Sequence, residues 1–177
     1  MGDTIQAGIG QSDNLFTILQ LANYCATIAN NGTRYKCHYV KYIMSADHSE
    51  IVYEAKPEIV AETGISQSTI DIVKQGMLAV TTTGSCKTAF ANITEKVGAK
   101  TGTTQVKRVI DGQTVEGNNG LNISFAPYDN PEIAIAVIIE NLDSGTATAT
   151  VSADIYEYYF STKNQVSSSQ SANELLR

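Results

Sequence analysis

The chain has 177 residues, 42% of them hydrophobic, which is enough for one domain with a real core. Its formal net charge of -6 and its lack of any lysine or arginine cluster exclude nucleic acid as a partner, because phosphate binding depends on concentrated positive charge. No segment reaches the roughly 18 apolar residues of a membrane-spanning helix, so the sequence predicts a soluble chain without a membrane segment. The three cysteines lack C-x-x-C or histidine partners, and we expect no disulfide, no metal site and no cofactor.

A first helix is predicted to begin at Thr17 and to end near Asn31. Thr17 and Gln20 have the spacing of a capping box, in which each side chain satisfies a backbone N–H at the helix start. Apolar residues, among them Cys25, then recur every three or four positions along one face. Asn31 and Gly32 tolerate the left-handed conformation of a helix C-cap. We expect Cys25 to pack on this face as a small hydrophobic residue.

A hairpin and a second helix are predicted next. Apolar residues partly alternate between residues 39 and 53 around a polar turn at residues 45–48, which indicates a small hairpin beside the main body. Residues 68–80 place apolar side chains on one side of a helix. Three threonines and a glycine at residues 81–84 make a poor continuation, so the helix should stop there.

The pattern then changes from helical to strand-like. Strands are predicted at residues 97–104, 121–125 and 133–139. The last of these is apolar on both faces, so we expect it to be central in the sheet, covered by helices on each side and antiparallel to its neighbour. Residues 109–115 contain Asp-Gly between short β-prone runs, which predicts a hairpin turn at the rim of the sheet.

A last helix is predicted over residues 147–160, with an apolar face that packs on the preceding strand. Its aromatic residues are interpreted as core and interface packing. Residues 161–177 are rich in serine, glutamine and asparagine and have little to bury, so they cannot offset their ordering entropy. We therefore expect a folded part at residues 1–160 and a disordered polar tail at residues 161–177.

Four consecutive residues on the first predicted strand of the sheet carry the chemistry of an anion site. Lys100 supplies a cation, Thr101 and Thr103 supply hydroxyl groups, and Gly102 lets a ligand approach the backbone without meeting a Cβ. A strand with this set of groups is suited to holding a carboxylate. The sequence therefore indicates an anionic substrate beside this strand.

The order of the predicted elements resembles that of the C-terminal half of the penicillin-recognising serine enzymes. The amino-acid sequence most resembles the transpeptidase domains of class B penicillin-binding proteins. The similar stretches lie between about residues 2 and 160: Ile9–Gln11, Leu19–Asn23, Ala26–Gly32, Gly98–Thr104, Phe125–Pro127 and Ile138–Asn141. Ile18 and Cys37 stand where this family commonly has proline. Neither departure involves a residue with chemistry.

The resemblance implies an α+β chain with a partial β-lactamase/transpeptidase-like fold. The antiparallel sheet would consist of the Lys-Thr-Gly strand and the two strands that follow it, covered by helices. Residues 1–160 would be the C-terminal portion of a transpeptidase domain, and the half that carries the S-x-x-K motif would be absent.

The resemblance also implies roles for the four strand residues. Lys100 is expected to add positive potential beside the nucleophile, whereas Thr101 and Thr103 would bind the terminal carboxylate of a peptide or a β-lactam. Gly102 would keep the groove open, and the backbone N–H of Thr103 would be one donor of the oxyanion hole. The nucleophile of the family is the serine of S-x-x-K, with its lysine as base, and this chain contains no S-x-x-K. Both residues are expected upstream of this chain.

Two other polar features are given no catalytic role. Ser12, Asp13 and Asn14 spell the S-x-N motif of the family, but their place just before the first helix favours a connecting loop. His38 and His48 have no serine or cysteine placed as an obvious partner, and lone histidines are more often structural.

The leading hypothesis is a fragment of a peptidoglycan D,D-transpeptidase that cross-links stem peptides and binds penicillin. The isolated chain is expected to be inactive because its nucleophile is missing. A serine β-lactamase or D,D-carboxypeptidase fragment and a non-catalytic scaffold with this fold remain alternatives. The resemblance implies a membrane-anchored parent with this domain on the outer face of the cytoplasmic membrane. Exposed apolar surface of the truncated sheet favours self-association.

Overall fold

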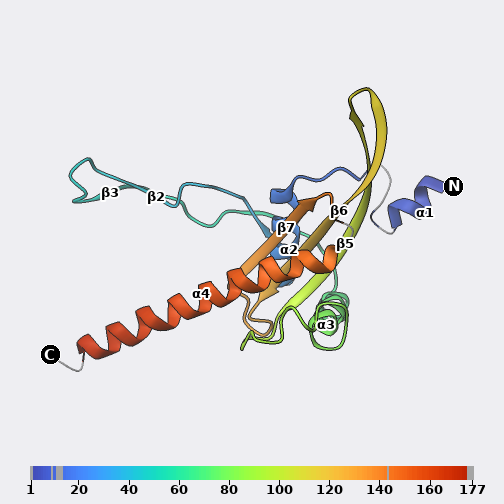
Figure 1. Cartoon of the computed structure of the whole chain (residues 1–177). Coiled ribbons are helices and arrows are strands. Elements are labelled where there is room, and N and C mark those ends of the chain that lie inside the picture. Colours follow the sequence, from blue (N-terminus) through green and yellow to red (C-terminus); the bar gives the residue numbers. More distant parts are fainter. Residues whose placement is uncertain (1, 9, 11–13, 143, 175–177) are drawn as a thin grey trace.

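The computed structural model describes residues 2–8, 10, 14–142 and 144–174 (Figure 1). At its centre is an antiparallel sheet in the order β5-β6-β7, with β5 at Gly98–Ile110, β6 at Gln113–Ala126 and β7 at Ile133–Glu140. Asp111 and Gly112, between β5 and β6, have φ angles of 51° and 76°, as a two-residue hairpin turn requires. The predicted Asp-Gly turn is confirmed, and it forms the tip of one long hairpin.

Helices cover both faces of this sheet (Figure 1). The covering helices are α2 (Ile18–Ala29), α3 (Gln67–Thr82) and α4 (Gly145–Glu174), whereas α1 (Gly2–Gly8) lies apart from the sheet near the N-terminus. α2 lies against β6 and β7 on one face, α3 runs beside β5, and α4 crosses the opposite face. The predicted α+β fold, with an antiparallel sheet covered by helices, is confirmed.

Two hydrophobic clusters hold these layers together. The smaller cluster joins α2 and α3 to the sheet through the buried residues Cys25, Ala29, Met77 and Phe125. The larger cluster lies under α4 and comprises Cys86, Phe90, Val97, Ala99, Ala126, Ile135, Ala149, Ala153, Tyr156 and Phe160. Small residues dominate where α4 meets the sheet, so the helix approaches the strands closely.

The ends of α2 follow from local chemistry. The backbone N–H of Thr17 donates to Gln20 Oε1 at 2.8 Å, and the N–H of Gln20 donates to Thr17 Oγ1 at 3.2 Å. Asn31 and Gly32 follow the helix with φ angles of 56° and 96°. The predicted capping box and the predicted end near Asn31 are both confirmed. α3 likewise has Ser66 as its N-cap and begins at Gln67, one residue before the expected region.

Two small antiparallel pairs lie between α2 and α3. They are β1 (Thr33–Tyr35) with β4 (Ile59–Glu62), and β2 (Tyr42–Met44) with β3 (Ile51–Glu54). The sequence predicted the β2–β3 hairpin but not the pair β1–β4. Figure 1 shows this hairpin projecting away from the sheet, and every residue of β2 and β3 is exposed. The expectation that it lies beside the main body was wrong.

β7 differs from its predicted central position. Helices cover it on both faces, as expected, but within the described residues its only strand neighbour is β6. The central strand of the three is β6. Continuous apolar character reports that both faces are covered, and it carries no information on whether both edges are paired.

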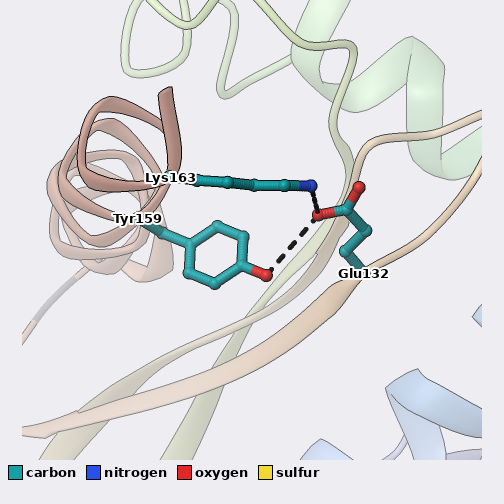
Figure 2. A network of polar contacts seen from close by, with 3 residues as sticks. All are labelled: Glu132, Tyr159 and Lys163. Atoms are coloured by element: carbon teal, nitrogen blue, oxygen red, sulfur yellow. Dashed lines mark hydrogen bonds and ion pairs between the residues drawn. The ribbon is translucent and has the colours of Figure 1, made fainter. Parts of the chain in front are cut away.

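α4 continues to Glu174, whereas we expected the helix to end at Phe160. Beyond that point Lys163 forms an ion pair with Glu132, just before β7 (Figure 2). Tyr159, which precedes Phe160, donates from its Oη to the same carboxylate at 3.5 Å. The hydrogen bond to Glu132 raises the pKa of Lys163. Among the described residues, no helix is both long and apolar enough to cross a membrane. The division of the chain at residue 160 remains a prediction, and residues 175–177 lie outside the described residues.

Candidate functional site

The Lys-Thr-Gly-Thr residues, 100–103, lie in the first half of β5. They pair in register with Ile123, Asn122, Leu121 and Gly120 of β6. In the described part of the chain β5 has a strand neighbour on one side only, so it is an edge strand. An edge strand presents unpaired backbone N–H and C=O groups that an extended peptide can use.

The four residues are divided between the two faces of β5, because successive side chains of a strand point to opposite faces. Thr101 and Thr103 share the face of their cross-strand partners Asn122 and Gly120, which is covered by α4. Lys100 and Gly102 share the other face. Lys100 is exposed, and its ammonium group donates to the backbone oxygen of Thr101. The cation of Lys100 and the hydroxyl groups of Thr101 and Thr103 therefore lie on opposite faces of the same edge strand.

The side chain of Thr103 is held by the start of α4. The backbone N–H of Gly145 donates to Thr103 Oγ1 at 3.2 Å, although Thr103 itself is exposed. The hydroxyl group thus has a defined direction at the edge of the sheet. This contact was not foreseen from the sequence, which placed the start of the last helix two residues later.

Gly102 is not required by the packing of the described residues. A Cβ added to Gly102 would lie 3.7 Å from Leu121 Cβ, which is an ordinary van der Waals contact. Its φ is also not in the left-handed region that favours glycine. Among the described residues, neither packing nor backbone conformation requires glycine at this position, and the missing side chain leaves space for a ligand beside β5.

The charge of Lys100 reaches a buried thiol beside the strand. Burial raises the pKa of Cys86, while a hydrogen bond with Ser85 and the positive charge of Lys100 act in the opposite direction. Cys86 is fully buried, so the thiol is protonated and packs as part of the core. Within the first half of β5, residues 98–104, Lys100 is the one lysine or arginine.

The other candidates are not brought to this strand. His48 lies in the turn between β2 and β3 with a φ of 58°, and His38 is exposed before β2. Ser12 and Asp13 lie outside the described residues. No group of three His, Cys, Asp or Glu side chains in the described ranges is arranged to hold a metal ion.

Comparison with known proteins connects this strand to a family. The family model described as "Penicillin binding protein transpeptidase domain" matches residues 1–157. The chain belongs to this family. The match includes the whole sheet and the Lys-Thr-Gly strand.

Relatives of known name are penicillin-binding proteins and transpeptidases. The chain is 31% identical over 176 residues to penicillin-binding protein 2A of Bacillus subtilis, covering 93% of this chain and 24% of that protein. It is also 31% identical over 174 residues to peptidoglycan D,D-transpeptidase MrdA of Acinetobacter baumannii, covering 93% and 25%. The structure of penicillin-binding protein 2B of Streptococcus pneumoniae superposes with a TM-score of 0.67 and 32% identity, covering 81% of this chain and 24% of the other. The predicted resemblance to class B penicillin-binding proteins is confirmed.

The chain spans about a quarter of the length of these relatives. The family relationship therefore applies to the sheet, its helices and the Lys-Thr-Gly strand.

A buried polar row beside the strand escaped the sequence analysis. Ser152 Oγ of α4 donates to Asn122 Oδ1 at 2.9 Å, and Tyr156 Oη donates to Ser124 Oγ at 2.9 Å. All four residues are almost fully buried. The sequence does show polar residues at every second position of β6 and at every fourth position of α4. The same spacing, however, is typical of a strand face or a helix face that is exposed to water.

Proposed function

We propose that this chain forms the Lys-Thr-Gly wall of the active site of a peptidoglycan D,D-transpeptidase. The observation that carries the proposal is the position of residues 100–103 on an edge strand of a domain that belongs to the penicillin-binding transpeptidase family. A stem peptide lying along β5 would gain backbone hydrogen bonds as an added strand. Its carboxylate would lie between the cation of Lys100 and the hydroxyl groups of Thr101 and Thr103.

In this reaction a serine hydroxyl attacks the carbonyl carbon of the penultimate D-alanine, and the terminal D-alanine leaves as the free amine. A neighbouring amine then attacks the acyl-serine ester and releases the serine. The backbone N–H of Thr103 would donate to the oxyanion of each tetrahedral intermediate. One such donor contributes about 3 to 4 kcal/mol to catalysis. Lys100 would add positive potential at the same place.

The serine nucleophile is proposed to lie outside this chain. The nine lysines of the sequence have no serine three positions before them, so the chain has no S-x-x-K motif. The isolated chain would offer half of the oxyanion hole and no acylation site, and it would be inactive alone. By the same family relationship, we propose that the whole protein is membrane-anchored, with this domain outside the cytoplasmic membrane.

A fluorescent penicillin tests the proposal. The full-length protein encoded by the gene should be labelled covalently, and the isolated chain should not. Lys100→Ala should slow labelling of the full-length protein, whereas Lys163→Ala, which alters an exposed lysine on α4, should not. Labelling of the isolated chain that survives Lys100→Ala would contradict it, since the acylated group would then lie within this chain. Steady hydrolysis of the penicillin would favour the β-lactamase alternative.

The isolated chain is proposed to self-associate. β5 and β7 both lack an outer neighbour among the described residues, and apolar side chains such as Leu15 and Phe16 are exposed by 91% and 62%. Sedimentation velocity should detect dimers or larger species. A monomer that also melts cooperatively in calorimetry would contradict this expectation.

A further inference from the structure

The first turn of α4 lies directly on the Lys-Thr-Gly strand. Gly145 is the first residue of the helix, and a Cβ added there would overlap the carbonyl oxygen of Gly102. The same atom would lie 2.9 Å from the carbonyl carbon of Gly102 and 3.0 Å from the backbone oxygen of Leu121. Real Cβ atoms do not make such contacts with backbone. Only a glycine lets the helix begin at this depth.

Thr103 caps this helix from a distant strand. The first N–H groups of a helix have no partner inside the helix and must find one elsewhere. The N–H groups of Thr146 and Ala147 are satisfied locally by Ser144, at 3.2 Å to Oγ and 3.3 Å to the backbone oxygen. The N–H of Gly145 donates instead to Thr103 Oγ1 at 3.2 Å, across 42 residues of sequence. Helix start and strand are thus joined by one steric contact and one hydrogen bond.

The position of α4 along the sheet is fixed by the buried polar row. A helix face built from alanines, here Ala149 and Ala153, offers little resistance to sliding. The hydrogen bonds Ser152–Asn122 and Tyr156–Ser124 each have one length and one direction, so they select a single register. The first turn is therefore held at a defined place on β5.

A second glycine borders the same turn from the sheet side. A Cβ added to Gly120, the cross-strand partner of Thr103, would lie 2.9 Å from Leu142 Cδ2, the end of a flexible side chain. It would also lie 3.1 Å from the backbone oxygen of Ser144 and 3.2 Å from Thr148 Cγ2. These contacts are tight but milder than the overlap at Gly145. A side chain at Gly120 would lift the first turn of α4 from the sheet without adding an atom beside Gly102.

We propose that Gly145 is a positioning residue for the substrate wall. This role rests on the function proposed above. Gly145 would contact neither the substrate nor a β-lactam. It acts through Gly102 and Thr103 by setting how far β5 stands out from the sheet and where the Thr103 hydroxyl group points. A displacement of about 1 Å in a reacting group can lower a rate about a hundredfold. The start of α4 is therefore part of the catalytic geometry.

Acylation of the full-length protein by a fluorescent penicillin tests this role, because rate and final labelled fraction report different defects. Gly145→Ala should lower the second-order acylation rate constant by at least about tenfold, while the final labelled fraction stays near that of the wild type. Gly120→Ala should lower the rate constant in the same direction by less. Should Gly145→Ala prevent folding, the milder Gly120→Ala variant still decides between the outcomes.

Two glycines on other elements serve as matched controls. Gly76 is an exposed residue of α3 with nothing within 4 Å of an added Cβ, so Gly76→Ala should leave the rate constant intact and should not lower stability. Gly32→Ala places a Cβ 2.6 Å from Thr63 Oγ1 and should destabilise the fold away from β5. It should reduce the labelled fraction and leave the rate constant of the folded molecules unchanged.

The outcomes separate this inference from the proposed function. A wild-type protein that is not labelled would contradict both. A labelled wild type whose Gly145→Ala and Gly120→Ala variants react at the wild-type rate would overturn the positioning role alone. Loss of labelled fraction without loss of rate, as in Gly32→Ala, would assign Gly145 to folding only. In a double-mutant cycle, Gly145→Ala and Thr103→Val should lower the rate by less than the product of their separate effects.

Discussion

The hydroxyl group of Tyr156, on α4, donates a hydrogen bond of 2.9 Å to Ser124 Oγ, on β6, in the centre of the core. Neither residue has any exposed surface. Burial raises the pKa of Tyr156 above its ordinary value, so the phenol keeps its proton at neutral pH and remains a hydrogen-bond donor. This contact joins the C-terminal helix to the middle strand of the sheet.

Tyr156→Phe should lower the free energy of unfolding by about 1 to 2 kcal/mol, because it leaves the buried Ser124 hydroxyl without its partner. Urea unfolding of the chain measures this change. Tyr158→Phe is the matched control, since Tyr158 is on the same helix and 73% exposed, and it should change stability by less than about 0.5 kcal/mol. Adding Ser124→Ala to Tyr156→Phe should restore part of the loss. Equal effects of the two tyrosine variants would contradict the proposed contribution of the hydrogen bond.

Asn122 should be replaceable together with its partner at little cost. Asn122 is 1% exposed, and its Nδ2 finds no hydrogen-bond partner among the described residues, whereas its Oδ1 accepts from Ser152. The double variant Asn122→Leu with Ser152→Ala removes the unsatisfied donor and its neighbour at nearly constant shape. Its unfolding free energy should equal or exceed that of the wild type by up to about 1 to 2 kcal/mol. Ser152→Ala alone should be destabilising, and a double variant less stable than that single one would refute the prediction.

Elements with local causes were predicted from the sequence, and elements with distant causes were not. The capping box of Thr17 and Gln20 acts within one helical turn, so four consecutive residues are enough to predict it. The same is true of the turn at Asp111 and Gly112. The start of α4 depends on Thr103, a residue 42 positions away, and no local pattern marks that dependence.

The same difference between local and distant causes applies to the residues of the candidate site. Lys100 to Thr103 carry their chemistry in the tripeptide and its neighbour, so sequence reasoning found them. Gly145 contributes only by lacking a side chain where two backbones meet, which is visible once the distance to Gly102 is known. Asn122 and Ser152 are polar residues in positions that would ordinarily face water, and only the fold shows that they face each other.

Two glycines in helical context should respond oppositely to alanine. Gly32, just after α2, has a φ of 96°, and an added Cβ would lie 2.6 Å from Thr63 Oγ1 and 3.1 Å from Ile70 Cδ1. Gly32→Ala should therefore cost about 1 to 3 kcal/mol. Gly76, within α3, has free space around it, and Gly76→Ala should stabilise the chain by up to about 1 kcal/mol. Denaturant midpoints of the two variants, measured together, provide the test, and a shift in the same direction would contradict it.

The three thiols should react at very different rates. Cys25 and Cys86 are fully buried, and burial raises the pKa of Cys25 to about 12 and that of Cys86 above its ordinary value. Cys37 is exposed. At pH 8 a chromogenic disulfide reagent should therefore modify one thiol rapidly in the folded chain and all three after unfolding. Cys37→Ser should abolish the rapid phase. A rapid phase that persists in this variant would show that one of the buried thiols is accessible.

The turn of the β2–β3 hairpin should weaken in acid because of Asp47. Its carboxylate accepts hydrogen bonds from the hydroxyl of Ser45 at 2.6 Å and from the hydroxyl of Ser49 at 2.8 Å. These hydrogen bonds lower the pKa of Asp47 from 3.8 to about 2, and the bond from Ser45 contributes most. A group whose pKa is lower in the folded state stabilises that state above its unfolded pKa, and this contribution is lost as the pH falls. The turn should therefore be intact above about pH 4 and should loosen between pH 4 and pH 2.

Carboxyl-carbon chemical shifts of Asp47, followed by NMR between pH 1.5 and pH 6, measure this titration directly. The wild-type midpoint should lie near pH 2, as the two hydroxyl donors require. Ser45→Ala should raise it more than Ser49→Ala, because the bond from Ser45 makes the larger contribution. The double variant should move the midpoint toward 3.8, the ordinary value. Glu54 of β3 reports separately on the strands, so loss of its cross-strand pairing with Tyr42 before Asp47 titrates would show that acid opens the hairpin by another route.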